Sequence, residues 1–286
     1  MRTLFFRFAR HPYPDFKYIC KNFHTQTAAM IYYFSGCGNS RFIAESIAQA
    51  LNEPLVFIPE AEREGNLTLQ LAQGERLGFV FPIYSWRPPQ LVMDFVKKLK
   101  ADCGSAPDYV WMAATCGDNG GYADRVFAKQ LKEALGLPLH AAFCFEMPNT
   151  YINMSFMGVD KPAVAQRKIG QAKAKLPEVI RDISGRKAVW QMRRGIFPCI
   201  KTYGIGRSFY KWVTDEPFHS TDACISCGRC VQACPLQNIT LEEGRPRWQG
   251  HCTNCDACFH HCPKNAIQFG KASVGKGQYY FGIFSK

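Results

Sequence analysis

A duplicated cysteine pattern near the C-terminus constrains this chain more than any other feature. Two copies of the spacing C-x2-C-x2-C-x3-C-P lie 28 residues apart, the first formed by Cys224, Cys227, Cys230 and Cys234 and the second by Cys252, Cys255, Cys258 and Cys262. Three cysteines at this spacing wrap one cuboidal cluster, and the fourth lies on a turn that crosses to the other half. We therefore expect two [4Fe–4S] clusters, one held by Cys224, Cys227, Cys230 and Cys262, the other by Cys252, Cys255, Cys258 and Cys234. All-cysteine ligation predicts low reduction potentials, roughly −400 mV.

Zinc and disulfides are the alternatives for these eight cysteines. CxxC pairs also form tetrahedral zinc sites, but zinc needs only two pairs and leaves the third cysteine and the trailing Cys-Pro unexplained. A disulfide framework would spread across a short secreted chain. Here eight of 14 cysteines gather at one end of a 286-residue chain. The pattern thus favours metal in a reducing compartment, and we expect a cytoplasmic protein.

The first 29 residues do not show a clear periodicity. They contain five basic residues and one acidic residue, and Met30 directly precedes an apolar, strand-like run. Three interpretations remain: a start assigned upstream of the true Met30, a short ordered or frayed extension, and an organelle-type presequence. The chain lacks the ~18 consecutive apolar residues of a membrane span, so we expect no transmembrane segment.

From residue 30 the chain alternates short apolar runs with helical patterns, which is typical of βαβ units. The runs that predict strands are Ile31–Phe34, Leu55–Ile58, Leu77–Phe81, Tyr109–Ala114 and His140–Phe145. Helical patterns cover Arg41–Leu51, Gln90–Lys100, Tyr122–Leu135 and Ala163–Ile183. Near-continuous apolar strands indicate a parallel sheet covered on both faces, with ligands bound at the carboxyl ends of its strands.

A glycine-rich loop follows the first expected strand and leads directly into a helix. Its residues are Ser35, Gly36, Cys37, Gly38, Asn39 and Ser40. Such a loop suits a phosphate monoester, because backbone amides and the helix N-terminus both favour an anion. The alternative is an ordinary glycine-rich turn. The run resembles the FMN phosphate loop of flavodoxin-like proteins, although Cys37 stands where that family usually has threonine, which removes one phosphate hydrogen bond worth ~0.5–1.5 kcal/mol.

Two later loops would hold the flavin ring if that resemblance is carried through. One follows the third strand and contains Tyr84 and Trp86; the other follows the fourth and contains Asn119, Gly120 and Tyr122. The resemblance implies that the aromatic rings stack on the flavin and that the Asn-Gly-Gly backbone approaches the ring edge. Ordinary packing of these aromatic residues is the alternative.

The net charge of +12 comes mainly from one segment. Residues 161–220 hold thirteen basic and four acidic residues, with aromatic residues interleaved. Four roles are open for this segment: a connector packed between two domains, a docking surface for an acidic redox partner, a membrane-surface contact and nucleic-acid binding. The first is favoured, and nothing else in the chain resembles a nucleic-acid-binding fold, so no nucleic-acid partner is expected.

Taken together, residues 30–270 resemble proteins that fuse a flavodoxin-like domain to a bacterial 2[4Fe–4S] ferredoxin. The resemblance implies a doubly wound α/β flavodoxin-like sheet at 30–160, a last helix and basic connector at 161–217, a small α+β ferredoxin domain at 218–270 and a tail at 271–286. It further implies an electron-transfer iron–sulfur flavoprotein of an anaerobic or facultative bacterium, with redox proteins as partners and with single electrons passing between the clusters and FMN. Two alternatives stay open: a flavin-dependent reductase of a small molecule, and a non-redox scaffold that has lost FMN. No acid–base constellation predicts catalytic residues.

Overall fold

A six-stranded parallel sheet forms the centre of the larger part of the molecule. The computed structural model describes residues 30–69, 74–101 and 107–283, so the predictions for residues 1–29 lie outside the described residues. The strand order is β2-β1-β4-β6-β7-β8, built from β1 (Met30–Tyr33), β2 (Leu55–Phe57), β4 (Arg76–Pro82), β6 (Tyr109–Cys116), β7 (Ala141–Glu146) and β8 (Trp190–Gln191). Its first five strands have the 2-1-3-4-5 order of flavodoxin-like folds. The predicted fold class is therefore confirmed.

The central strands are buried on both faces, as their continuous apolar sequences predicted. All eight residues of β6 are buried, and so are the five central residues of β4. Strands in this position are shielded from water on both faces of the sheet, which favours continuous apolar runs over an alternation of apolar and polar residues. β3 (Thr68–Leu69) and β5 (Lys100–Ala101) form a separate two-stranded parallel ladder.

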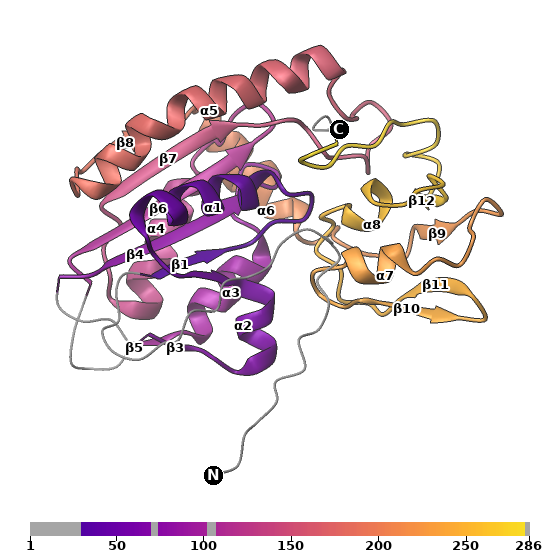
Figure 1. Ribbon diagram of the computed structural model, residues 1–286, viewed down its shortest axis with the longest axis horizontal. Helices are drawn as coiled ribbons and strands as arrows, with labels where there is room; N and C mark the ends of the chain where they lie inside the picture. The colour runs from indigo at the N-terminus through magenta and orange to yellow at the C-terminus, as the bar shows by residue number, and fades with distance from the viewer. Residues whose placement is uncertain (1–29, 70–73, 102–106, 284–286) are drawn as a thin grey trace, which may run out of the picture.

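Helices cover the two faces of the sheet (Figure 1). On one face α1 (Asn39–Leu51) packs beside α5 (Pro162–Ser184), over a core that includes Trp111 and Phe143. On the other face α3 (Gln90–Lys98) packs beside α4 (Ala123–Leu135). The short helix α2 (Ile58–Glu64) was not predicted, because its first residue completes an apolar run that indicated a strand. Pro59 at its start has the fixed backbone angle that suits a first helical turn.

The C-terminal part is a smaller α+β unit in two related halves, as predicted. β9 (Phe218–Ser220) pairs with β12 (Ile267–Phe269), and β10 (Ile239–Glu242) pairs with β11 (Arg245–Trp248), both antiparallel. The short helices α7 (Arg229–Ala233) and α8 (Ala257–His260) lie against each other. A separate apolar core, which includes Phe259 and Ile267, holds the halves together.

A connector between the two parts runs over the loops at the carboxyl edge of the sheet. It comprises β8, the π-helix η1 (Ile200–Ile205) and α6 (Gly206–Phe209). Thr202 and Gly206 are buried against the sheet's loops, and the Tyr210 hydroxyl donates a hydrogen bond to the Pro88 carbonyl. Phe197 and Trp212 are exposed, so only part of the connector packs between the domains. None of the described helices combines the length and apolar character that a membrane crossing requires.

Candidate metal centre

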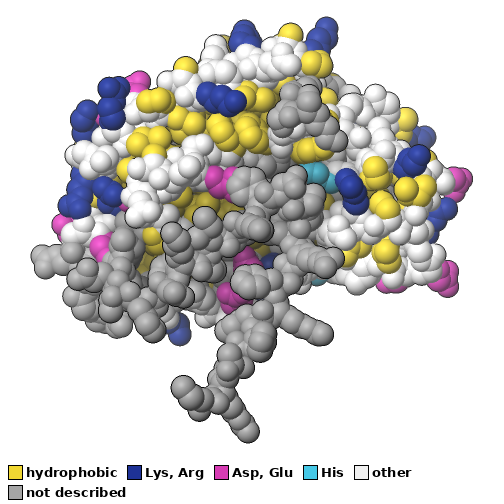
Figure 2. All heavy atoms as spheres, in the orientation of Figure 1, with side chains coloured by type: hydrophobic (Ala, Val, Ile, Leu, Met, Phe, Trp, Pro, Cys, Tyr) yellow, Lys and Arg dark blue, Asp and Glu magenta, His cyan; other side chains and the backbone are white. Residues whose placement is uncertain are grey.

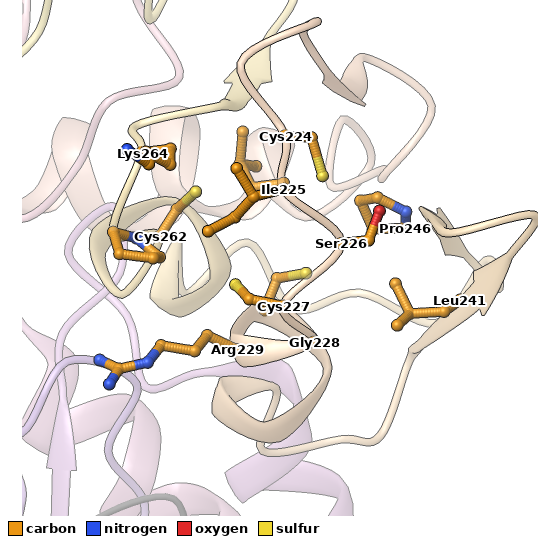
Figure 3. Close-up of a pocket in the computed structure, with 13 residues that line it drawn as sticks. Cys224, Ile225, Ser226, Cys227, Gly228, Arg229, Leu241, Pro246, Cys262 and Lys264 are labelled. Carbon is orange, nitrogen blue, oxygen red and sulfur yellow. The ribbon is translucent and has the colours of Figure 1, made fainter.

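The first set of cysteines surrounds one pocket in the C-terminal unit (Figure 3). Cys224, Cys227 and Cys230 come from the first half, and Cys262 joins them from the second. Burial, with a smaller contribution from the neighbouring thiols of Cys262 and Cys224, raises the pKa of Cys230 to about 11. Cys227 is exposed while Cys230 and Cys262 are buried, so this site lies at the surface.

The second set of cysteines is gathered in the same crossed manner. Burial raises the pKa of Cys252 to about 12, and the Cys234 thiol adds to this effect through space. Burial likewise raises the pKa of Cys255 and of Cys258, and Cys234 again contributes to both. Because Cys234 belongs to the first half, the fourth cysteine of each half sits with the first three of the other.

The backbone of the two halves has the same shape around these sulfurs. Ser226 and Gly228 have φ angles of 54° and 71°, and the residues 28 positions later, Asn254 and Asp256, have 52° and 59°. Left-handed residues at these positions curl the chain and turn backbone amides inward. Three backbone N–H groups donate hydrogen bonds to cysteine sulfurs. They are those of Asn238 to Cys234 at 3.3 Å, Asn254 to Cys252 at 3.3 Å and Ala266 to Cys262 at 3.2 Å.

This arrangement fits a metal cluster better than a single ion. A tetrahedral zinc site with Zn–S bonds of ~2.3 Å requires its sulfurs to converge closely. Among the described residues, no three His, Cys, Asp or Glu side chains converge on a single-ion site. The buried indole N–H of Trp248 faces the Cys258 thiol and lowers its pKa, although burial raises it more strongly. It is a donor suited to the sulfur of a bound cluster.

The second cysteine set lies directly against the predicted phosphate loop. A Cβ atom added at Gly36 would lie 2.6 Å from the Cβ of Cys255, so only glycine allows this approach. The Cys37 thiol donates to the Cys255 carbonyl at 3.3 Å. The chain's last described segment covers the loop as well, since the Phe281 amide donates to the Cys37 carbonyl at 2.8 Å.

Protein partners occupy the side chains of the predicted phosphate loop. Ser40 shares a hydrogen bond of 2.7 Å with Thr115, and the Ser35 hydroxyl accepts one from the Gly38 amide at 3.1 Å. Asn39 donates to the Pro148 carbonyl at 2.9 Å and accepts from the Tyr279 hydroxyl at 2.8 Å. The loop does precede a helix through the left-handed Gly38, as a phosphate loop would.

The connector covers the loops predicted to hold a flavin ring. Tyr84 is packed edge-on against Phe34 and lies near Cys255. Gly121 lies between Trp86 and Thr202, and the Tyr122 amide donates to the Thr202 hydroxyl at 2.8 Å. 

Two more contacts close these loops from the connector side. The Gly120 amide donates to the Arg193 carbonyl at 2.8 Å, and Gly195 lies against the Asn119 side chain. In this arrangement protein contacts occupy the loops in which the sequence predicted FMN.

Comparison with known proteins agrees with the cysteine geometry. Residues 211–267 match the family model described as a 4Fe-4S dicluster domain. The chain is 35% identical over 57 residues to the pyruvate synthase subunit PorD of Methanothermobacter marburgensis, covering 20% of this chain and 68% of that protein. This chain belongs to the 4Fe–4S dicluster ferredoxin family. Its ferredoxin domain is also 42% identical over 69 residues to a ferredoxin of Pyrobaculum islandicum, covering 21% of this chain and 64% of that protein.

The chain thus spans less than two thirds of the length of that ferredoxin, and its own α/β domain lies outside the matched family segment. Together with the strand order above, the ferredoxin domain makes it a fused flavodoxin-like and ferredoxin protein.

Solved structures similar to the chain are distant in sequence. The Trp repressor binding protein from Bacillus subtilis has 15% identity and a TM-score of 0.34, covering 52% of this chain and 94% of that one. An azoreductase from Bacillus anthracis has 10% identity and a TM-score of 0.32, covering 54% and 99%. Similarity at this level does not bear on what this chain binds.

The sequence interpretation missed the residues that join the two domains. Residues 271–286 were assigned only as a tail, yet the Phe281 ring stacks on Phe42 with centroids 4.3 Å apart. Asp256, beside Cys255, is fully buried, and burial raises its pKa to about 8. Aromatic residues near the end of the chain were the one signal that could have predicted a docked segment.

Proposed function

We propose that this chain is an electron-transfer protein that binds two [4Fe–4S] clusters. The first would be held by Cys224, Cys227, Cys230 and Cys262, the second by Cys252, Cys255, Cys258 and Cys234. The observation that carries the proposal is the crossed grouping of the fourth cysteines, which a two-cluster ferredoxin requires. The same chemistry supports a reducing, cytoplasmic compartment as part of this proposal.

Bound clusters of this type take up and release single electrons. The chain's own residues give the two sites different roles. Exposed Cys227 and half-buried Cys224 bring the first site to the surface, where electrons can be exchanged with another protein. Cys255 holds the second site against the flavodoxin-like domain through its contact with Gly36. The arrangement therefore supports electron transfer between an external partner and the interior of the molecule.

The external partner is proposed to be an acidic redox protein. Arg229 and Lys264 lie on the rim of the first site and are both exposed (Figure 3). Their charge would steer an acidic surface toward the exposed cysteine. On the face of the molecule seen in Figure 2, Lys and Arg side chains are scattered rather than gathered in one patch.

FMN in the flavodoxin-like domain stays a prediction. The strand order and the glycine loop support it, while the contacts of Cys37, Asn39 and Tyr122 oppose it in the closed arrangement described here. FMN would require the connector and the segment around Phe281 to move away. The second candidate function is a flavodoxin-like domain that binds no flavin and serves to dock the ferredoxin domain. The protein contacts that occupy the side chains of the glycine loop favour it.

Anaerobic purification with quantification of iron, sulfide and flavin tests these proposals. We expect eight iron and eight sulfide ions per chain, because two [4Fe–4S] clusters hold four of each, and reversible bleaching of the visible absorbance on reduction. The variant Cys230→Ala should lose the first cluster's signal, whereas Cys199→Ala, at an exposed cysteine outside both sets, should retain both. A preparation that contains only zinc would refute electron transfer, and stoichiometric FMN would refute the flavin-free domain.

A further inference from the structure

Two cysteines outside the ferredoxin domain face each other in the flavodoxin-like domain. Cys116 is the last residue of β6, and Cys144 lies in the neighbouring parallel strand β7. Their sulfur atoms are 3.3 Å apart, and both side chains are buried. Of the other described cysteines outside the ferredoxin domain, Cys37 donates to a carbonyl group and Cys199 is exposed.

The cysteine pair is accessible through a cavity of about 220 Å³ at the edge of the sheet, which both cysteines line. Lys175 and Arg193 line it as well, together with Glu146 and Asp118. The Lys175 ammonium donates to the Cys144 carbonyl at 2.9 Å, so a positive charge lies close to this thiol. A small reductant, oxidant or alkylating reagent can therefore reach the two sulfurs.

The surroundings shift the pKa values of the two thiols in opposite directions. The hydrogen bond from the Cys116 thiol, the Arg193 backbone amide and the Lys175 charge lower the pKa of Cys144, although burial opposes them. The same hydrogen bond and burial raise the pKa of Cys116. A hydrogen-bonded thiol–thiolate pair is the reactive form in thiol–disulfide chemistry.

The pair is connected to the second cluster site by continuous contacts. Thr115, next to Cys116, shares a 2.7 Å hydrogen bond with Ser40 of the glycine loop. Gly36 of that loop lies against Cys255, and a Cβ atom at Gly120 would lie 3.7 Å from the Cys144 sulfur. The thiols thus lie beside the loops in which the sequence predicted a flavin ring.

We propose that Cys116 and Cys144 form a reversible dithiol–disulfide centre that stores two electrons in the flavodoxin-like domain. On reduction two electrons pass singly from the reduced iron–sulfur clusters, the S–S bond breaks, two protons are taken up and two S–H bonds form. On oxidation two S–H bonds break, one S–S bond forms, two protons leave and the two electrons pass to a small disulfide oxidant that enters through the cavity. The clusters as the source of electrons rest on the proposed function above. The sulfurs must close from 3.3 Å to the ~2.05 Å of a disulfide.

Thiol trapping on the intact holoprotein tests the centre directly. The protein is equilibrated anaerobically with oxidised or reduced dithiothreitol, alkylated with N-ethylmaleimide and analysed by peptide mass spectrometry. We expect a Cys116–Cys144 linkage in most chains after oxidation, fully alkylated thiols after reduction, and an alkylated Cys199 in both. Alkylation of Cys116 and Cys144 to the same extent in both buffers would overturn the proposal.

Reductive titration measures the electrons that the centre stores. Oxidised wild-type protein should take up two more electrons per chain than Cys116→Ala or Cys144→Ala, whereas Cys199→Ala should match the wild type. Equal uptake by wild-type and variant chains would contradict the proposal. Failure of the cluster absorbance to bleach in every protein would instead contradict the proposed electron-transfer function, and the trapping result would still decide whether the disulfide forms.

Discussion

Gly36 is a residue at which the two domains approach each other closely. Its α-carbon faces Cys255, which the sequence predicts as a ligand of the second cluster. The same glycine was predicted to serve a phosphate group through its backbone. The structure gives another reason for it, since a side chain at this position would collide with the ferredoxin domain.

Substitution of Gly36 by alanine should loosen this junction. The added Cβ atom would lie 2.6 Å from the Cβ of Cys255, and overpacking of this kind costs about 1–3 kcal/mol. Chemical denaturation of the cluster-loaded protein measures the change in the free energy of unfolding. Gly170→Ala in α5 is the matched control, because its Cβ would meet no atom within 4 Å and should stabilise the helix by about 0.5–1 kcal/mol. Equal effects of the two variants would show that Gly36 does not mediate the contact.

At the scale of elements, the connector is held to the sheet by a buried ion pair. Arg194 donates to both carboxylate oxygens of Asp124, which lies in the first turn of α4 and is fully buried. The same guanidinium donates to the Gly121 carbonyl at 3.0 Å. One side chain thus fixes the connector against both α4 and the loop that precedes it.

Removal of this guanidinium should release the connector. Arg194→Ala leaves the Asp124 carboxylate buried without a partner, which costs about 3–5 kcal/mol. We expect a lower free energy of unfolding and faster hydrogen exchange in residues 190–206. Lys129→Ala, which breaks an exposed pair with Glu133 in the same helix, should cost less than about 1 kcal/mol. Unchanged exchange of the connector in Arg194→Ala would argue against this role of the ion pair.

The sequence predicted the elements of the sheet well because their signal is local. The five expected strands and four expected helices are present, with ends that differ by one or two residues, as in β6, which continues to Cys116. The crossed cysteine sets were also predictable, since their spacing alone encodes the crossing. The junction could not be predicted: the contact of Gly36 with Cys255 joins residues 219 positions apart, and no spacing or periodicity relates them.

At the scale of the whole molecule, the ferredoxin domain depends on its metal. Its core is small, and burial raises the pKa of Cys230 and Cys252. These thiols therefore lose their protons readily only when a bound metal cation stabilises the thiolates. Metal binding to such a site contributes directly to the stability of the fold. The flavodoxin-like domain instead has two apolar cores of its own, on either face of the sheet.

Removal of iron should therefore unfold the molecule in part. We expect an iron chelator under reducing conditions to abolish hydrogen-exchange protection in residues 218–269 and to raise exchange at residues 35–40, which the ferredoxin domain covers. Strands β4 and β6 should keep their protection, which serves as the internal control. Simultaneous loss of protection in β4 would show that the two domains unfold as one unit.

The stacking of Phe281 on Phe42 has a consequence for the biosynthesis of the chain. The glycine loop is among the first parts of the sheet to leave the ribosome, but its cover is translated some 240 residues later. At the ~5–20 residues per second of translation, the nascent sheet would present an open loop for roughly ten seconds or more. That interval gives a small anionic molecule access to the loop before the C-terminal segment closes over it.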